Sequence, residues 1–144
     1  MNNILHKRKK YRILILDDSE FYNMLLTREL ENHTMGIQLE NEMDFIIESY
    51  TSAEKCMAKI KDDTSIAFID YYLGNGITAS DVMRKLKQKA RNCRIVILSQ
   101  TYSIRTALKT ITEGAAEFVL KDKMALEKCC FMVSDFVKGR LVTA

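Results

Sequence analysis

The chain has 144 residues, of which 47% are hydrophobic and 28% charged, a composition typical of one globular domain with an ordinary core. No apolar run approaches the roughly 18 residues of a membrane span, and residues 1–10 lack the apolar segment of a secretory signal. Five of the 22 basic residues fall within residues 7–12, ahead of the first acidic one. The other 17 are set against 19 acidic residues, so the net charge of +3 comes from one end of a slightly acidic chain.

The uneven charge divides the chain into a basic tail, residues 1–11, and a domain, residues 12–144. Such a tail can contact nucleic acid or anionic lipid, but a solvated chain end is the simpler interpretation. We therefore expect that the domain itself binds neither nucleic acid nor a membrane. The four cysteines have no C-x-x-C spacing, which favours buried thiols in a reducing cytoplasm over disulfides or a zinc site. They are Cys56, Cys93, Cys129 and Cys130.

Five short apolar runs have the length and composition of buried strands. They cover residues 12–17, 45–50, 65–70, 94–99 and 117–121. Helical patterns separate them. The first begins after Ser19, a suitable N-cap, and has apolar residues at helical spacing. These are Phe21, Met24, Leu25 and Leu30. Residues 31–44 show no clear period and form either a long helix end or a long connection.

The remaining helices have recognisable starts. Residues 51–54 fit a capping box, residues 78–81 resemble another helix start, and Asp122 can cap the last helix. Their apolar faces comprise Cys56, Met57 and Ile60; Val82, Met83 and Leu86; Ile104, Ala107, Leu108 and Ile111; and Leu126, Cys129, Cys130, Val133 and Val137. A strand followed by a helix, repeated five times, predicts an α/β domain with a parallel sheet, helices on both faces and right-handed crossovers.

Chemically useful side chains end four of the predicted strands. Asp17 and Asp18 end the first, Asp70 the third, Ser99 the fourth and Lys121 the fifth. Each alone has an ordinary structural explanation, such as a helix cap, a turn residue or a solvated lysine. Because the carboxyl ends of parallel strands share one edge, which is where open α/β sheets bind ligands, the set predicts a common site.

The chemistry of such a site follows from its charges. Three clustered carboxylates repel one another, and a hard divalent cation such as Mg²⁺ would keep them ionised. A carboxylate beside that ion can attack phosphorus, and Lys121 and Ser99 can stabilise the transferred group. Asp70, held at the end of a rigid buried strand, is the best candidate nucleophile. The sequence has no P-loop and no G-x-G-x-x-G motif, so a nucleotide is not the evident phosphate source.

These five residues, in this order and spacing, resemble the signature of response-regulator receiver domains of two-component signalling. The resemblance extends from about residue 12 to residue 137, and residues 114–121 are similar to the final-strand motif of that family. It implies a flavodoxin-like (βα)5 doubly wound sheet of strand order 2-1-3-4-5. It also places Phe118 at the switch aromatic position.

The resemblance further implies roles for single residues. Asp18 and Asp70 would bind Mg²⁺ directly, Asp17 mainly through water, and the backbone carbonyl of Tyr72 would complete the protein ligands. Asp70 would accept a phosphoryl group from a histidine kinase or a phosphotransfer protein. Ser99 and Lys121 would then hold the phosphoryl group, and Phe118 would turn inward.

The implied outcome is a switched surface read by a downstream protein, in a cytoplasmic phosphorelay. The surface would include Tyr102, Arg105, Lys109 and the last helix. The domain would catalyse only its own phosphorylation and dephosphorylation, so we expect no enzyme in the usual sense. The chain leaves little room for an output domain, which predicts a single-domain regulator; dimerisation stays open.

Two positions and one loop depart from the family pattern: Asp122, Gln100, and the loop after Asp70, which lacks the usual proline and is one residue longer. Asp122 stands where proline usually follows the conserved lysine, and we expect a trans bond there because a non-proline cis bond costs about 3 kcal/mol. Gln100 replaces a small residue and predicts weaker coupling between Ser99 and Phe118. Tyr72 is bulky enough to shield an acyl phosphate from water, although simple packing at the rim explains it equally well.

Other functions remain open. A degenerate receiver would bind partners without phosphorylation, and Gln100 and the altered loop after Asp70 give that alternative some weight. An aspartate-nucleophile phosphohydrolase would instead have D-x-D at the first strand, where this chain has adjacent acids. A flavin-binding flavodoxin would need hydroxyls and glycines in the first loop.

Overall fold

The computed structural model describes residues 8–143, with side chains to residue 139. Five strands alternate with five helices over this range. The strands are β1 (Lys9–Leu16), β2 (Met43–Tyr50), β3 (Thr64–Asp70), β4 (Arg94–Ser99) and β5 (Glu117–Leu120). The helices are α1 (Glu20–Glu40), α2 (Ala53–Ala58), α3 (Ala79–Lys89), α4 (Ile104–Thr112) and α5 (Ala125–Thr143). The sheet is parallel throughout with the order β2-β1-β3-β4-β5, which confirms the predicted flavodoxin-like topology.

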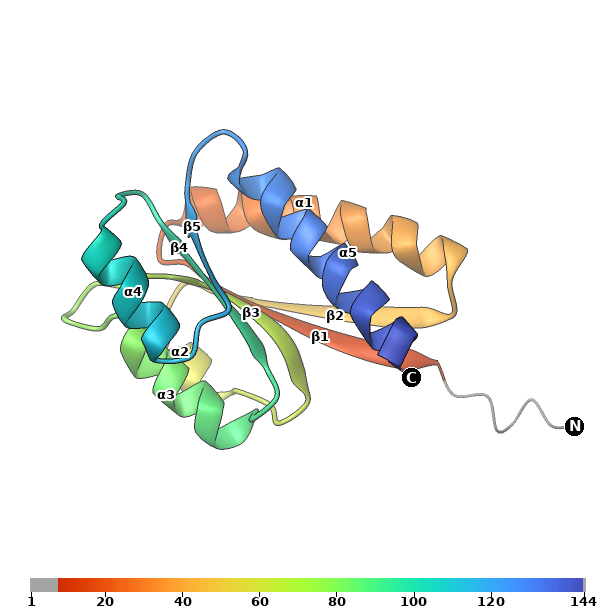
Figure 1. Cartoon of the computed structure of the whole chain (residues 1–144), viewed down its shortest axis with the longest axis horizontal. Coiled ribbons are helices and arrows are strands. Elements are labelled where there is room, and N and C mark those ends of the chain that lie inside the picture. Colours follow the sequence, from red (N-terminus) through yellow and green to blue (C-terminus); the bar gives the residue numbers. More distant parts are fainter. Residues whose placement is uncertain (1–7, 144) are drawn as a thin grey trace, which may run out of the picture.

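The domain has three layers, with α1 and α5 on one face of the sheet and α2, α3 and α4 on the other (Figure 1). Successive residues of a strand point to opposite faces, so each central strand supplies two cores. Ile13 and Ile15 pack in the core under α1 and α5, whereas Leu14 and Leu16 pack in the core under α2 and α3. Two-sided burial explains why these strands are continuous apolar runs.

The first strand begins earlier than its apolar run. Lys9, Lys10 and Tyr11 pair with the start of β2, so part of the predicted tail lies in the sheet, and residues 1–7 lie outside the described residues. The ring of Tyr11 is buried, stacks on Phe45 at 5.5 Å between centroids and meets Phe136 edge-on at 6.1 Å. Aromatic packing therefore extends the strand into a basic stretch.

Helix α1 continues to Glu40, which settles the open choice for residues 31–44 in favour of a long helix. Its inward face is not formed by all the residues that the apolar spacing indicated. Phe21 and Met24 are exposed, while the buried positions are Asn23, Leu26, Leu30 and Thr34. Asn23 is buried because its amide donates to two backbone carbonyls, so a polar residue sets the rotation of the helix.

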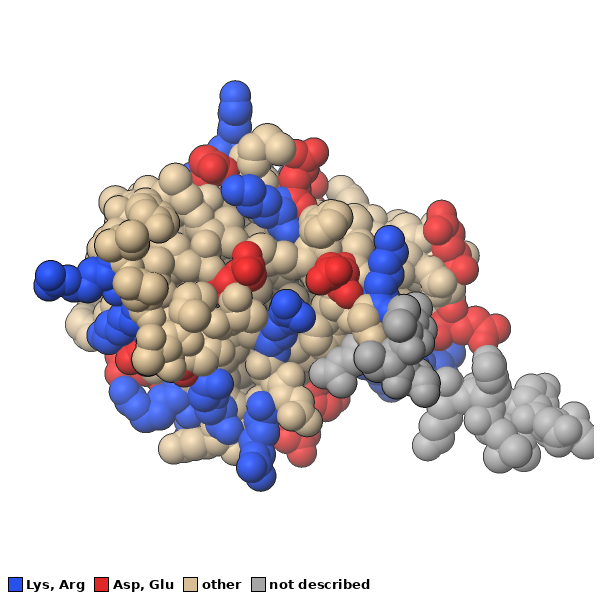
Figure 2. Space-filling model, in the orientation of Figure 1, with Lys and Arg blue, Asp and Glu red and all other residues tan. Residues whose placement is uncertain are grey.

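The other helix starts agree with the sequence in part. Helix α3 begins after Thr78, as expected, and a capping box forms between Thr78 and Asp81. The N-cap of α2 is Ser52 rather than Thr51, and because α2 ends at Ala58, the buried Ile60 follows it outside the helix. Helix α3 carries basic residues in its last turn, which suits the negative end of its dipole, and Figure 2 shows Lys and Arg gathered over this part of the surface.

The apolar face predicted for helix α4 is exposed, not buried. The helix forms, but Ile104, Leu108 and Ile111 are exposed, and Thr110 is its buried residue. The apolar stripe therefore faces away from the core. The four cysteines are free thiols. Cys56, Cys129 and Cys130 are buried as predicted, whereas Cys93 is only half-buried. Within the described residues, no helix combines the length and apolar character that a membrane crossing requires.

Candidate functional site

Three carboxylates meet at the carboxyl-terminal edge of the sheet. Asp17 directly follows β1, Asp70 ends β3, and these two strands are neighbours. One oxygen atom from each of Asp17, Asp18 and Asp70 lies within 4.8 Å of the other two. Asp17 and Asp70 are buried and Asp18 is exposed, so the cluster opens to solvent on one side. Hard oxygen ligands at this spacing fit a divalent cation such as Mg²⁺.

Lys121 brings a positive charge to the same place from the end of β5. Its Nζ lies 2.7 Å from Asp17 Oδ2 and 3.1 Å from Asp70 Oδ1. The lysine side chain is only 3% exposed, so these ion pairs form in a poorly hydrated setting. The structure thus brings together four of the five residues that the sequence singled out. Asp17, Asp18 and Asp70 form one cluster, and Lys121 contacts Asp17 and Asp70 directly.

The pKa of Asp70 is raised to about 7. Burial is the main cause because it disfavours the charged carboxylate, and the charge of Asp17 adds to it, while Lys121 acts in the opposite direction. In the metal-free protein near neutral pH, Asp70 is therefore partly protonated. A bound cation would favour the ionised form, which is the form able to act as a nucleophile.

Asp17 is held by the backbone around it. Its Oδ1 accepts a hydrogen bond from the backbone N–H of Ser19 at 2.9 Å, and its own N–H donates to the carbonyl of Tyr50 at 3.1 Å. The Asn23 amide donates to the carbonyls of Asp17 at 3.2 Å and Tyr50 at 2.8 Å. Sequence reasoning missed Asn23; the available signal was a polar residue at an inward position of the helix that follows the acidic pair.

Ser99 ends β4 at the same edge of the sheet and is 1% exposed. Its carbonyl accepts a hydrogen bond from the Lys121 N–H at 2.8 Å, and its Oγ accepts one from the Thr101 N–H at 3.3 Å. The hydroxyl thus lies beside the cluster, engaged with the loop that follows β4. Phe118, on β5, is half-buried and meets Tyr102 of that loop edge-on at 6.1 Å. Gln100 is exposed, and its effect on switching stays a prediction.

The loop after β3 turns sharply beside the site. Gly74, Asn75 and Gly76 all have positive φ, and the Tyr72–Thr78 bridge closes the loop. A Cβ built on Gly74 would lie 3.7 Å from Asp18 Oδ2, so the loop backbone passes close to the acidic cluster. Tyr72 is 57% exposed, and the predicted metal-binding role of its carbonyl stays a prediction. Within residues 8–143 no peptide bond is cis, so the Lys121–Asp122 bond is trans, as expected.

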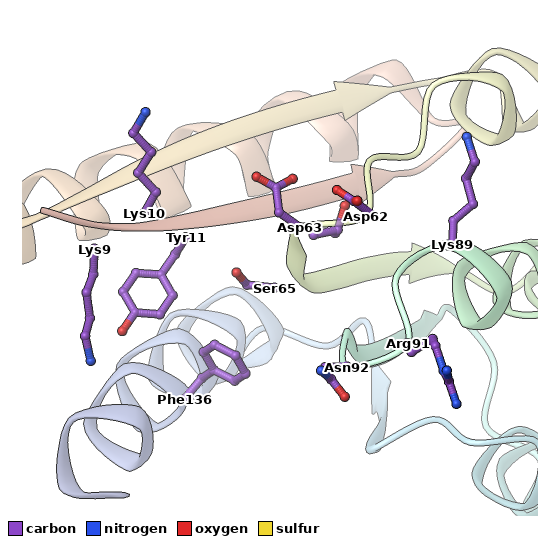
Figure 3. A pocket seen from close by; sticks show the side chains of 11 residues that line it. Lys9, Lys10, Tyr11, Asp62, Asp63, Ser65, Lys89, Arg91, Asn92 and Phe136 are labelled. Atoms are coloured by element: carbon purple, nitrogen blue, oxygen red, sulfur yellow. The ribbon is translucent and has the colours of Figure 1, made fainter. Parts of the chain in front are cut away.

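A hollow of about 700 Å³ lies at the opposite end of the sheet, where strands β1, β3 and β4 begin (Figure 3). Its lining includes the rings of Tyr11 and Phe136, which are buried against the core. Lys9 and Lys10 point to opposite sides in Figure 3, and Asp63 is paired with Arg12. The charged groups there do not converge, in contrast to those of the acidic edge.

The chain is thus a flavodoxin-like α/β domain with three clustered carboxylates and a buried lysine at one edge of its parallel sheet. No family model matches the chain, and no curated protein matches it in sequence. Solved structures do match it. The beryllofluoride-activated receiver domain of DrrB, a Thermotoga maritima response regulator, has a TM-score of 0.73 at 16% identity, covering 90% of this chain and 98% of that one.

Two further solved structures are similar to this chain. The response regulator TrrA from Thermotoga maritima, in complex with Mg²⁺ and beryllofluoride, has a TM-score of 0.68 at 20% identity and covers 88% of this chain and 98% of that one. A CheY-like receiver domain from Methanospirillum hungatei has a TM-score of 0.67 at 19% identity and covers 92% and 99%. The chain therefore has the fold of response-regulator receiver domains, which confirms the resemblance at the level of fold.

Proposed function

We propose that the chain is a phosphoacceptor receiver domain, in which Mg²⁺-dependent phosphorylation of Asp70 switches a protein-interaction surface. One observation carries the proposal: the ammonium of Lys121 contacts both Asp17 and Asp70 within a cluster of three carboxylates. Buried ion pairs of this kind are costly to assemble, and here they surround a carboxylate whose pKa lies near neutrality. The fold adds support, since two of the similar structures contain beryllofluoride.

The carboxylates of Asp17, Asp18 and Asp70 are the residues that would hold the ion. When bound, Mg²⁺ would supply positive charge that offsets the repulsion between the carboxylates and the incoming phosphoryl oxygens. An oxygen of Asp70 then forms the new bond to phosphorus while the phosphorus–nitrogen bond of a donor phosphohistidine breaks. The electron pair of that bond returns to the imidazole of a histidine kinase or phosphotransfer protein.

Lys121 and Ser99 act on the transferred group. The lysine ammonium already lies 3.1 Å from Asp70 Oδ1, so it needs only a small shift to pair with a phosphoryl oxygen. The Ser99 hydroxyl would donate to another oxygen, drawing the loop after β4 with it. These charge-assisted hydrogen bonds exist only in the phosphorylated state and so bias a two-state surface. On this proposal the protein catalyses only its own phosphoryl transfer and dephosphorylation.

The exposed stripe of α4 is the surface that we propose meets a downstream protein. Ile104, Leu108 and Ile111 are 67%, 62% and 44% exposed, an unusual concentration of large apolar side chains on one short helix. Tyr102 leads into this helix and contacts Phe118, which links the stripe to β5.

The free thiols found throughout the described chain fit a reducing cytoplasm.

Phosphorylation with a small donor tests the proposal directly. The protein is incubated with Mg²⁺ and phosphoramidate, and intact mass spectrometry measures the gain of one phosphoryl group. We expect the gain in wild type, and its loss in Asp70→Asn or when EDTA removes the metal. Absence of the modification in wild type, together with no response to Mg²⁺ and beryllofluoride, would favour the degenerate receiver that binds partners without phosphorylation. Multiple turnover on a phosphate ester would instead indicate an enzyme.

A further inference from the structure

Tyr22, in the first turn of α1, lies against the ammonium of Lys121. The Nζ atom is 4.4 Å from the centre of the tyrosine ring. The same ammonium forms ion pairs with two carboxylates, at 2.7 Å from Asp17 Oδ2 and 3.1 Å from Asp70 Oδ1. Among the described residues, Nζ has no further acceptor. The lysine is thus enclosed by two anions and one aromatic ring, with only 3% of its side chain exposed.

The start of α1 places Tyr22 beside the acidic pair, and its side chain packs against the core under α1 and α5. The Tyr22 N–H donates to Oγ of Ser19, the N-cap, at 3.2 Å, so the tyrosine follows the acidic pair at a set distance along the first helical turn. Its hydroxyl is buried without a hydrogen-bond partner in the described structure. The hydroxyl therefore does not explain the placement, whereas the face of an aromatic ring attracts a cation.

We propose that Tyr22 is a positioning residue for phosphoryl transfer, whose ring holds the Lys121 ammonium beside Asp70 where the phosphoryl group arrives. The inference rests on the proposed function. A lysine ammonium is strongly hydrated and sits on a flexible four-carbon stem, so a buried one needs something to replace water and restrict its motion. The tyrosine ring does both without competing for the N–H donors that must reach the phosphoryl oxygens.

The decisive comparison separates the aromatic face from the volume of the side chain. Tyr22→Phe keeps the ring, whereas Tyr22→Leu keeps an apolar side chain without it. We expect Tyr22→Phe to be phosphorylated by phosphoramidate within about twofold of wild type, and Tyr22→Leu about 5- to 30-fold more slowly, as for a desolvated cation–π contact. That loss corresponds to about 1–2 kcal/mol. Phe21→Leu is the matched control, because Phe21 is adjacent but 66% exposed, and its rate is expected to be unchanged.

If the leucine variant folds poorly, fluorinated phenylalanines at position 22 provide a second test of the cation–π contact. Added fluorines weaken the negative face of the ring with little change in shape, so the logarithm of the rate is expected to fall steadily with fluorine number. A flat series, or equal rates for Tyr22→Leu and wild type, would overturn the inference. A slow Tyr22→Phe variant would do the same, since it would assign the effect to the hydroxyl.

A second measurement separates failure of this inference from failure of the proposed function. In the unphosphorylated protein, the ring should shift the Lys121 Hε resonances upfield, and the shift should vanish in Tyr22→Leu. If wild type is not phosphorylated at all, the proposed function fails and the positioning role fails with it, even where the resonance shift is seen. If wild type is phosphorylated and the variants match it, only the role of Tyr22 is lost.

Discussion

Asp70→Asn in metal-free protein tests the electrostatic account of the site. The carboxylate is buried beside Asp17, and its pKa is raised to about 7 from the ordinary 3.8. An asparagine in the same place keeps the shape and an oxygen that can accept from Lys121, but it does not titrate. The difference in unfolding free energy between the two proteins therefore isolates the cost of ionising Asp70 inside the fold.

The direction of the pH dependence of stability follows from proton binding. Between the two pKa values the folded protein binds the Asp70 proton and the unfolded chain does not, so rising pH removes stability from wild type. Applying the linkage relation between about pH 5 and about pH 8 gives a loss of about 2–3 kcal/mol. Asp70→Asn lacks this contribution. As the pH rises over that range, its unfolding free energy should therefore increase relative to that of wild type by the same amount.

Urea unfolding in EDTA at several pH values measures the effect, with circular dichroism as the signal. Mg²⁺ added at the upper end of the range should restore stability to wild type more than to the variant, because binding to the folded state stabilises it. A gap between the two proteins that stays constant from about pH 5 to about pH 8, to within about 0.5 kcal/mol, would refute the raised pKa and the cluster behind it.

Three further substitutions test separate parts of the structure. Lys121→Met leaves Asp17 and Asp70 without their ammonium partner, so metal-free unfolding at neutral pH should show a loss of about 3–5 kcal/mol; an unchanged midpoint would contradict the ion pairs. Leu30→Ala opens a cavity at a fully buried position and should cost about 2–5 kcal/mol by the same assay while leaving Asp70 phosphorylation intact. Tyr72→Ala should speed hydrolysis of the acyl phosphate, followed by loss of the phosphoryl mass after donor removal; an unchanged rate would show that the exposed ring does not shield it.

The sheet could be predicted because it is buried on both faces. Strands β1, β3 and β4 sit in the middle of the sheet and must be apolar throughout, and such runs stand out in any sequence. Their parallel alignment then places Asp17, Asp70 and Ser99 at one edge without further information. The same topology places Lys121, which follows β5, at this edge, whereas its ion pairs with Asp17 and Asp70 came only from the structure.

Helix faces were harder to predict, because apolar spacing alone does not say what a helix packs against. The stripe of Ile104, Leu108 and Ile111 has a regular helical period yet lies on the surface. In α1, the buried Asn23 donates to carbonyls of Asp17 and Tyr50, and the apolar spacing of the helix does not reveal these partners. The position of Tyr22 depends on the same helix rotation, and its contact with Lys121 joins residues far apart in the chain.

The charges of the site give a physical reason for Ser99 to respond to phosphorylation. An acyl phosphate at Asp70 carries about −2 where the ionised carboxylate carried about −1, so the proposed reaction adds negative charge to a buried place. Lys121 is already paired with two carboxylates, which leaves a need for another donor. The Ser99 hydroxyl accepts from the Thr101 N–H, and its own O–H has no acceptor among the described residues. It can therefore donate to the new oxygen while keeping its hold on the loop, and the loop that leads to Tyr102 and α4 would move with it.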